Sequence, residues 1–359
     1  MVRLTRAQQQ ERTRAAVLAA AKAEFTEHGY ALAKVDRIAE RAELTRGAVY
    51  SNFPGKRALY LAVLIEVAGG VASEPVTPPE SVHDALENFA RAWLERLPLG
   101  GTAWGGRLQL RSLDGVLDDE HAREVLAQAA RLEALLLAIA LEAGEPGRRV
   151  RLAELALILL DGATHRAETA PGFGDPFDLT HACRHLADIE LKDSWAPPHL
   201  PFVTPAKPYA DTWDAPGGLV DQISGKEADL ASDGLITVLG AGRLGAAEEA
   251  VRSGEPVTIV VVTGDPAETG SLVRLRVVDL LGCLRRVFAP EVWHQVQLVL
   301  DDDALVASAL GLTDPGDETE AAVRVEDGVI VARSSGRGAG HAVSVAQKTT
   351  QKTTRKATP

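Results

Sequence analysis

Apolar residues recur every three to four positions along the first 67 residues, which is the spacing of a helix face. Thr5 and Gln8 have the spacing of a capping box at the start of the first helix, and Gly29 is expected to end it. The pair Pro54-Gly55 stops the third helix. The four helices predicted for this head, residues 1–66, are 5–28, 35–42, 46–53 and 56–67.

A break with three prolines at residues 75–80 precedes a second region with helical periodicity. Long amphipathic or buried helices are predicted there, and no strand pattern interrupts them. We therefore expect an all-α domain over residues 67–192. Its helices are predicted at 82–97, 121–143, 150–166 and 179–191.

The pattern changes after residue 192. Residues 193–218 hold six prolines and two adjacent glycines, which predicts a linker. Strands and helices then alternate, and Asp327-Gly328 supplies the two-residue turn of a closing hairpin. An α/β domain is expected over residues 219–345. Its strands are predicted at 235–239, 257–263 and 296–300, its helices at 244–252, 272–288 and 304–310, and its hairpin at 321–332.

Charge divides the chain in the same way. The net charge is -12, yet residues 1–65 hold eleven basic and six acidic side chains. The low-complexity tail, residues 346–359, has four basic residues and no acidic ones, and is expected to be disordered. A basic head on an acidic body directs that head toward polyanions such as DNA.

Other features restrict the location of the protein. The longest uncharged apolar run, residues 134–141, is far below the ~18 residues of a membrane span. The N-terminus lacks the apolar core of a secretory signal. Only Cys183 and Cys283 occur, which does not suggest a disulfide framework or a cysteine zinc site. We expect a cytoplasmic protein with no membrane partner.

The third predicted helix carries the chemistry of a DNA-reading element. Thr45 is its expected N-cap, while Val49 and Phe53 can point inward. Hydrogen-bonding side chains and one glycine remain on the outward face, as a major-groove reader needs. The start of the next helix offers Lys56 to a phosphate. The predicted DNA-binding residues are Lys34, Arg37, Thr45, Arg46, Gly47, Tyr50, Ser51, Asn52 and Lys56.

The series VDRIAERA at residues 35–42, followed by LTRGAVYSNFPGK at 44–56, resembles the signature of the TetR family. The resemblance implies a homodimeric, non-enzymatic repressor that binds a palindromic double-stranded operator and releases it on binding a small-molecule effector. It also implies phosphate contacts from Lys34, Tyr50 and Lys56. Two departures stand out. Glu43 replaces the usual turn glycine, so the turn is expected to be reshaped, and Lys34 replaces a hydroxyl residue.

In TetR proteins the second domain encloses the effector and dimerises through its last two long helices. The resemblance implies that residues 152–164 and 177–189 correspond to these two helices here. Residues that could line the cavity are apolar, aromatic or imidazole side chains, with core packing as the alternative for each. They are Trp93, Trp104, Leu108, His121, His165 and Phe173. They do not identify the effector. His181 and His185 lie one helical turn apart, but with no third ligand evident they are expected to be ordinary surface histidines rather than a metal site.

The C-terminal order of elements resembles a thioredoxin-like fold. Activity in that family needs a reactive cysteine after the first strand, whereas the loop here, GAGRLG at residues 240–245, has none. The usual proline before the hairpin is also missing. Cys283 is expected to be a buried small residue. The resemblance therefore implies a redox-inactive domain, with no catalytic residue.

The same loop supports an alternative, because GAGRLG after a strand matches the G-x-G-x-x-G dinucleotide fingerprint, with Asp265 about 20 residues on. That would make the chain an NAD(P)-type sensor or oxidoreductase. The short following helix and the terminal hairpin do not favour it. Our expectation is a DNA-binding regulator without a cofactor.

Overall fold

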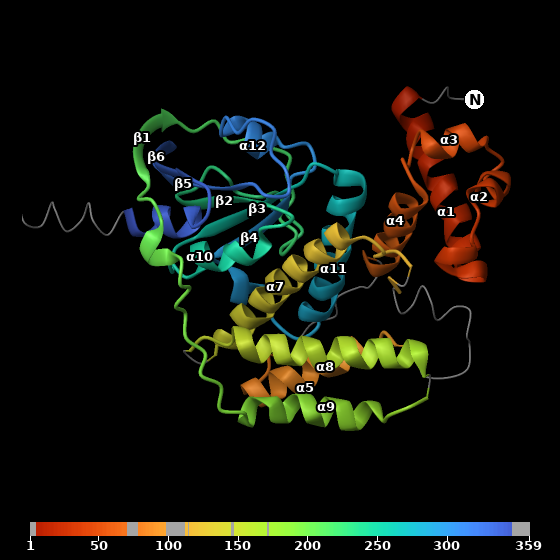
Figure 1. The fold of residues 1–359 in the computed structure, drawn as a ribbon, viewed down its shortest axis with the longest axis horizontal. Helices are drawn as coiled ribbons and strands as arrows, with labels where there is room; N and C mark the ends of the chain where they lie inside the picture. The colour runs from red at the N-terminus through yellow and green to blue at the C-terminus, as the bar shows by residue number, and fades with distance from the viewer. Residues whose placement is uncertain are drawn as a thin grey trace, which may run out of the picture.

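The structure is a computed structural model, and it describes residues 5–69, 78–97, 112–113, 115–144, 147–170 and 172–346. Figure 1 shows the helical head at one end, an α/β unit at the other, and α7 and α11 between them. The layer of α5, α8 and α9 lies beside these two helices. Trp104, Leu108 and the tail beyond residue 346 lie outside the described residues.

The head follows the predicted helices. Its first helix begins with the predicted capping box, in which Thr5 and Gln8 bond each other's backbone N–H groups. Gly29 adopts φ 66° and breaks the helical geometry three residues before the assigned end. Phe25 is fully buried and meets the ring of Tyr60 edge-on, with centroids 4.9 Å apart, so the first and fourth helices share one core. The head helices are α1 (Arg6–Leu32), α2 (Val35–Arg41), α3 (Arg46–Tyr50) and α4 (Lys56–Gly69).

The helical body is also as predicted within its described part. Ser81, Asp119 and Asp175 cap the starts of three of its helices with their side chains. Helix α5 (Val82–Leu94) packs on α9 (Pro176–His185), and α7 (Glu120–Glu142) packs on α8 (Val150–Thr169). The body helices are α5 (Val82–Leu94), α7 (Glu120–Glu142), α8 (Val150–Thr169) and α9 (Pro176–His185), followed by the 3-10 turn η1 (Leu186–Asp188).

The C-terminal unit is built on a six-stranded mixed sheet with the order β1-β6-β5-β2-β3-β4. The three strands β2, β3 and β4 are parallel, and β5 lies antiparallel to β2. Asp327 (φ 50°) and Gly328 (φ 72°) form the predicted hairpin turn between β5 and β6. The strands are β1 (Lys207–Thr212), β2 (Gly234–Gly240), β3 (Val257–Val262), β4 (Val296–Leu300), β5 (Glu320–Glu326) and β6 (Val329–Ser335).

Helices cover both faces of this sheet. One face packs on α12 and on a segment anchored by Trp213, whose indole nitrogen donates to the carbonyl of Leu230 (2.7 Å). The other face packs on α10, α11 and a helix at residues 339–346. The helices and turns of this unit are η3 (Leu244–Ala246), α10 (Ala247–Val251), the π-helical turn η4 (Pro266–Gly270), α11 (Ser271–Leu284), η5 (Pro290–Trp293) and α12 (Leu305–Ala309); the 3-10 turn η2 (Leu200–Phe202) precedes the sheet.

The predicted linker at 193–218 is wrong in one part. Residues Lys207–Thr212 form the edge strand β1, antiparallel to β6. Pro208 within it explains why no strand was expected, because proline is tolerated in a sheet only at an edge or a bulge. The helix at 339–346 was also not foreseen, since its small residues give a weak periodic pattern.

The α/β unit packs closely against the head and the helical body. Its helix α11 packs on α4, α5 and α7, and one hydrophobic core runs from Val17 in the head to Val343 near the end of the described chain. Ion pairs also join the α/β unit to the helical body, including the pair of Arg252 with Glu142 of α7 (2.6 Å). Among the described helices, none has the length and apolar character needed to cross a membrane.

Candidate DNA-binding surface and effector pocket

The turn between α2 and α3 keeps its left-handed residue without glycine. Glu43 adopts φ 56°, its N–H donates to the carbonyl of Glu40 (3.1 Å), and the N–H of Leu44 donates to Ala39 (2.9 Å). The expectation of a reshaped turn is therefore wrong. The backbone geometry is retained, and the strain of a side chain in the left-handed region, about 1 kcal/mol, remains in the fold.

Helix α3 is fixed from both ends. The hydroxyl of Thr45 accepts the N–H of Ala48 (3.2 Å), which begins the helix. Val49 and Phe53 are buried, as predicted from their spacing. Arg14 of α1 lies over the Phe53 ring, 4.4 Å from its centroid, and thereby ties the end of α3 to α1. Sequence reasoning missed this arginine because the contact spans 39 positions.

Three of the predicted DNA-binding residues form an accessible face on α3. Arg46 is exposed, and its guanidinium lies 5.4 Å from the centroid of the Tyr50 ring. Gly47 is exposed, and a Cβ at that position would meet only the hydroxyl of Thr45, at 3.8 Å. Among the residues that the structure describes, no packing contact requires the glycine, so the open space beside it is available to a partner.

Ser51 and Asn52 are less free than predicted. Both side chains donate to the carbonyl of Ala48, each at 2.9 Å. Ser51 remains exposed, whereas Asn52 is half-buried. These contacts close the last turn of α3. In the structure described here, the two side chains are therefore turned back toward the helix.

The basic residues around the turn differ in their freedom. Lys34 is exposed and has no side-chain capping contact. The Lys56 ammonium instead donates to the carbonyl of Ala31 (3.2 Å) and lies 4.7 Å from the Tyr30 ring centroid. Partial burial there lowers the pKa of Lys56. Lys56 therefore anchors the start of α4 to the end of α1.

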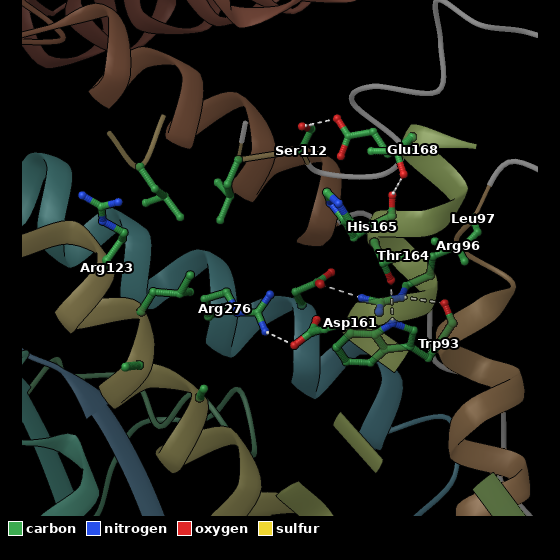
Figure 2. Close-up of a pocket in the computed structure, with 17 residues that line it drawn as sticks. Trp93, Arg96, Leu97, Ser112, Arg123, Asp161, Thr164, His165, Glu168 and Arg276 are labelled. Atoms are coloured by element: carbon green, nitrogen blue, oxygen red, sulfur yellow. Dashed lines mark hydrogen bonds and ion pairs between the residues drawn. The ribbon is translucent and has the colours of Figure 1, made fainter. Parts of the chain in front are cut away.

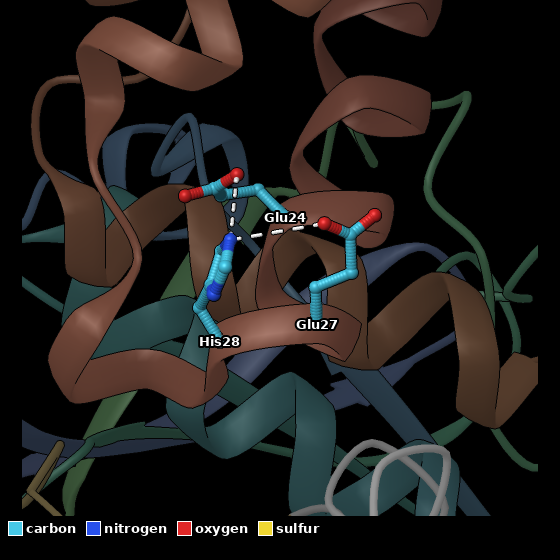
Figure 3. A group of neighbouring side chains, drawn as sticks. All are labelled: Glu24, Glu27 and His28. Carbon is cyan, nitrogen blue, oxygen red and sulfur yellow. Dashed lines mark ion pairs between the residues drawn. The ribbon is translucent and has the colours of Figure 1, made fainter.

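Behind the turn, Glu24, Glu27 and His28 of α1 form a compact cluster (Figure 3). Three such ligands could suit a metal ion, but two arginines of α2 already occupy the carboxylates. Arg41 binds Glu27 through two nitrogens (2.9 and 2.5 Å) and lies 3.3 Å from the buried Glu24, and its hydrogen bond lowers the pKa of Glu27. Arg37 contacts His28 (3.2 Å) and Glu24 (3.8 Å). The cluster is an ion-pair network that fastens α2 to α1.

A cavity of about 850 Å³ lies between the body and the α/β unit (Figure 2). Its apolar wall comes from α5, α7 and the segment just before α7. Polar side chains of α8 face that wall, and two residues of α11 reach the cavity as well. The lining residues are Trp93, Arg96, Leu97, Ser112, Leu113, Leu117, Arg123, Leu126, Ala127, Ala130, Asp161, Thr164, His165, Glu168, Thr169, Arg276 and Asp279.

Ion pairs form the floor of this pocket. Arg96, two residues after the end of α5, pairs with Asp279 (2.6 Å), and its guanidinium also stacks 4.0 Å from the Trp93 ring centroid. Arg276 pairs with the buried Glu133 of α7 (2.8 Å) and lies 3.6 Å from Asp161. Burial raises the pKa of Glu133 to about 7, although Arg276 opposes that shift.

The pocket brings together two of the six residues predicted to bind an effector. Trp93 and His165 both line it, and the Trp93 indole donates to the Thr164 hydroxyl (3.0 Å). His121 does not line it, because its imidazole pairs with Asp317 of the α/β unit (2.9 Å). Phe173 does not line it either and is 75% exposed. Sequence reasoning missed Arg276 and Asp279, since no local pattern places α11 beside α5 and α8.

The other histidines and the cysteines have ordinary surroundings. His185 pairs with Asp188 (2.9 Å), which also contacts His83 (2.8 Å). Cys183 and Cys283 are both buried, and burial raises the pKa of the Cys183 thiol to about 12. Neither thiol lies in a setting that favours the thiolate.

The glycine loop at 240–245 is filled by protein atoms. A Cβ on Gly240 would lie 2.2 Å from the carbonyl oxygen of Asp317, and one on Gly245 would lie 2.9 Å from the Arg131 side chain. The glycines therefore admit neighbouring chain segments where a pyrophosphate would have to sit. The following helix α10 has only five residues, and Asp265 caps η4. The nucleotide-binding alternative is at odds with this packing.

Comparison with known proteins shows what the helical head is similar to. Residues 17–63 match the family model described as bacterial regulatory proteins, tetR family. The chain is also similar to the HTH-type transcriptional repressor SCO4008 of Streptomyces coelicolor, with 36% identity over 88 residues. That match covers 24% of this chain and 41% of the relative, so the chain spans less than half the length of the relative it matches.

Two solved structures of TetR regulators also match, with weak superposition. One, from Rhodococcus sp. RHA1, has 21% identity and a TM-score of 0.32, and covers 50% of this chain and 95% of its own. The other, described as a putative TetR-family regulator from Mesorhizobium loti, has 20% identity and a TM-score of 0.27. That match covers 52% of this chain and 96% of the other chain. The similarity therefore rests on the family model, whose match at residues 17–63 runs from within α1 to within α4 and includes all of α2 and α3.

Proposed function

We propose that the protein is a DNA-binding transcriptional regulator. The observation that carries this is the accessible face of α3, where Arg46, Gly47 and Tyr50 lie together inside the segment that matches the TetR model. Arginine and tyrosine donors beside a glycine suit base edges and phosphates in a major groove. Thr45 and Lys34 flank that face and add two further contacts to the backbone of the duplex.

We propose that the regulator is a homodimer on a palindromic operator. Its contact helices are α8 and α9, on which Ile158 and Phe177 are 67% and 79% exposed. Large apolar side chains on two neighbouring helices favour burial against a second copy. Two-fold pairing would set two heads on major-groove faces about 34–36 Å apart, or a multiple of that.

We further propose that the cavity between α5, α7, α8 and α11 holds a small-molecule effector whose binding releases DNA, so that the regulator is a repressor. The route to the head runs through α11, which contacts the cavity and also packs on α4. Arg57 at the start of α4 pairs with Asp119 (2.6 Å), the N-cap of α7, and lies 3.4 Å from Glu268 of η4, directly before α11. A ligand that shifts α11 changes the support of the head.

For the C-terminal unit we propose a thioredoxin-like relationship without redox activity. A parallel β-α-β-α-β arrangement followed by an antiparallel hairpin and a helix supports the relationship. The loop at 240–245 has no cysteine, and both cysteines of the chain are buried. The unit then serves ligand binding and packing.

The test is a fluorescence anisotropy titration with the DNA upstream of the protein's own gene, against random DNA of equal length. Arg46→Ala and Tyr50→Ala are expected to weaken specific binding, each by about 1–3 kcal/mol. Arg337→Ala, at an exposed arginine after β6 and away from the head and the proposed dimer helices, is the matched control and is expected to bind like wild type. Equal affinity of the wild-type protein for both DNAs would contradict the proposal.

A further inference from the structure

The α/β unit contributes directly to the pocket. Arg276 and Asp279 lie three residues apart on α11, and both face the cavity. Through their ion pairs with Glu133 of α7, Asp161 of α8 and Arg96 just after the end of α5, they join α11 to the helical body around the space. Figure 2 shows Arg276 beside Asp161, with His165 and Glu168 farther along the same helix, α8.

The Arg276 guanidinium has donor capacity left over. Both of its ion pairs are made by one nitrogen, Nη2. Nε is buried and has no hydrogen-bond acceptor among the described residues. Nη1 contacts no acceptor of the described chain either, while the side chain keeps 15% of its surface accessible at the cavity. Nη1 is thus the group that can donate to a molecule inside the pocket.

Charge decides which acceptor fits. The positive charge of Arg276 is matched by Glu133 at 2.8 Å, with Asp161 as a second carboxylate at 3.6 Å. Arg96 is matched by Asp279. Among the described residues, the floor therefore holds no unmatched cation, and an anion placed there would face carboxylates. An uncharged oxygen accepts from Nη1 without that repulsion.

The opposite wall determines the rest of the ligand. It consists of the Trp93 ring and the leucines and alanines of α7 and the segment before it. Such a wall favours an apolar or aromatic body. Arg123, at an exposed position of α7, donates to the carbonyl of Asp118 (3.4 Å) and makes no ion pair with a carboxylate among the described residues. Its exposure makes it a weak point of attraction for an anion.

We propose that α11 supplies the recognition group of this pocket: Arg276 hydrogen-bonds an uncharged oxygen, such as a ketone, ester or amide carbonyl, on a mainly apolar ligand. The inference rests on the proposed function of the pocket as an effector site. It makes the α/β unit part of the ligand site. An effector of this class would pull on α11 directly, and α11 also packs on α4.

Equilibrium dialysis with four naphthalene probes of matched size tests the ligand class. The probes are 2-acetylnaphthalene with a carbonyl, 2-ethylnaphthalene without one, 2-naphthoate as the anion and 2-naphthylmethylamine as the cation. With the wild-type protein, the ketone is expected to bind about tenfold more tightly than the hydrocarbon, as one hydrogen bond from a charged donor would give. The two charged probes are expected to bind more weakly than the ketone.

Variants test the residue. In Arg276→Met combined with Glu133→Leu, both members of the buried pair become apolar, which avoids an unpaired charge. The tenfold preference for the ketone is expected to disappear while the hydrocarbon still binds. Arg274→Met, an α11 arginine that pairs with Asp302 outside the pocket, is the control and is expected to keep the preference. Circular dichroism establishes that each variant is folded.

Several results would overturn the inference. They are equal binding of ketone and hydrocarbon to the wild type, tighter binding of either charged probe, or a ketone preference that survives in the double variant. Binding of none of the probes would overturn it too. Specific DNA binding by the same preparation would show that the regulator itself stands, because that titration requires no ligand.

Discussion

The guanidinium of Arg46 on α3 lies 3.2 Å from the carboxylate of Asp36 on α2. The Asp36 charge raises the pKa of Arg46, behind a larger effect of the contact with Tyr50. Both side chains of the pair are more than half exposed, so their attraction contributes little to stability. The pair nevertheless holds Arg46, which we propose as a DNA-binding donor, against an acidic neighbour while no DNA is present.

Asp36→Asn is therefore expected to strengthen DNA binding by up to about fivefold, because the pair no longer has to open and a charge that repels phosphate is lost. Anisotropy titrations at two salt concentrations measure the change. Glu40→Gln removes an equal charge at an exposed position of the same helix and is the control. An equal gain in both variants would show that net charge alone is responsible.

Glu43→Gly is expected to stabilise the protein by about 0.5–1 kcal/mol, since glycine adopts the φ of 56° without steric strain. Urea unfolding followed by circular dichroism gives the free energy. Glu40→Gly, three residues earlier inside α2, is expected to destabilise by about 1 kcal/mol. If both variants lose stability, the turn residue carries no relievable strain.

The buried Glu133 predicts a specific pH dependence. Burial raises its pKa in the folded state to about 7 from 4.5, with Asp161 and Asp279 adding to the shift and Arg276 opposing it. Between these values the folded state binds more protons than the unfolded state, so the contribution of Glu133 to stability falls as pH rises from about 4.5 to 7.

Glu133→Gln removes that contribution. The free energy of unfolding of the variant, minus that of wild type, is expected to increase between pH 5 and 7.5 and to level off above it. Thermal and urea unfolding at several pH values measure this difference. Glu124→Gln, at an exposed site on the same helix, supplies the control and is expected to show a flat difference. A flat difference for Glu133→Gln would contradict the raised pKa.

Removal of the α/β unit tests its integration. A chain ending at residue 218 would expose the surfaces of α4, α5 and α7 that α11 covers, together with the uncompensated Glu133. We expect it to aggregate or to unfold more than 10 °C below the full chain in a thermal scan. A chain ending at residue 346 is expected to melt like the full protein. Equal melting of the 218-residue form would show an independent appendage.

The head could be predicted from sequence because its information is local. Capping residues, the three-to-four spacing of Val49 and Phe53, and the stop after α3 are set by neighbours within a few positions. The strands of the α/β unit other than β1 could be predicted for the same reason, since their continuous apolar runs and the Asp327-Gly328 turn are also local signals.

The site was predicted only in part. Exposure of Arg46, Gly47 and Tyr50 follows from helix periodicity. The hydrogen bonds from the Asn52 side chain to the Ala48 carbonyl and from the Lys56 ammonium to the Ala31 carbonyl depend on side-chain rotamers. The spacing of residues on a helix face does not specify these rotamers. Of the residues predicted for the effector site from their type alone, Trp93 and His165 line the cavity, whereas His121 and Phe173 do not.

The sequence by itself determined the elements of this protein, the basic head and its helix-turn-helix, because spacing, capping and turn chemistry act over a few residues. Only the tertiary structure decided that α11 lies against α4, α5 and α7, that Arg276 and Asp279 complete the pocket, and that the glycine loop is filled. Apolar faces pack without a local code for their partner, since the hydrophobic effect is non-directional. Contacts between residues more than a hundred positions apart therefore follow from the fit of the whole core.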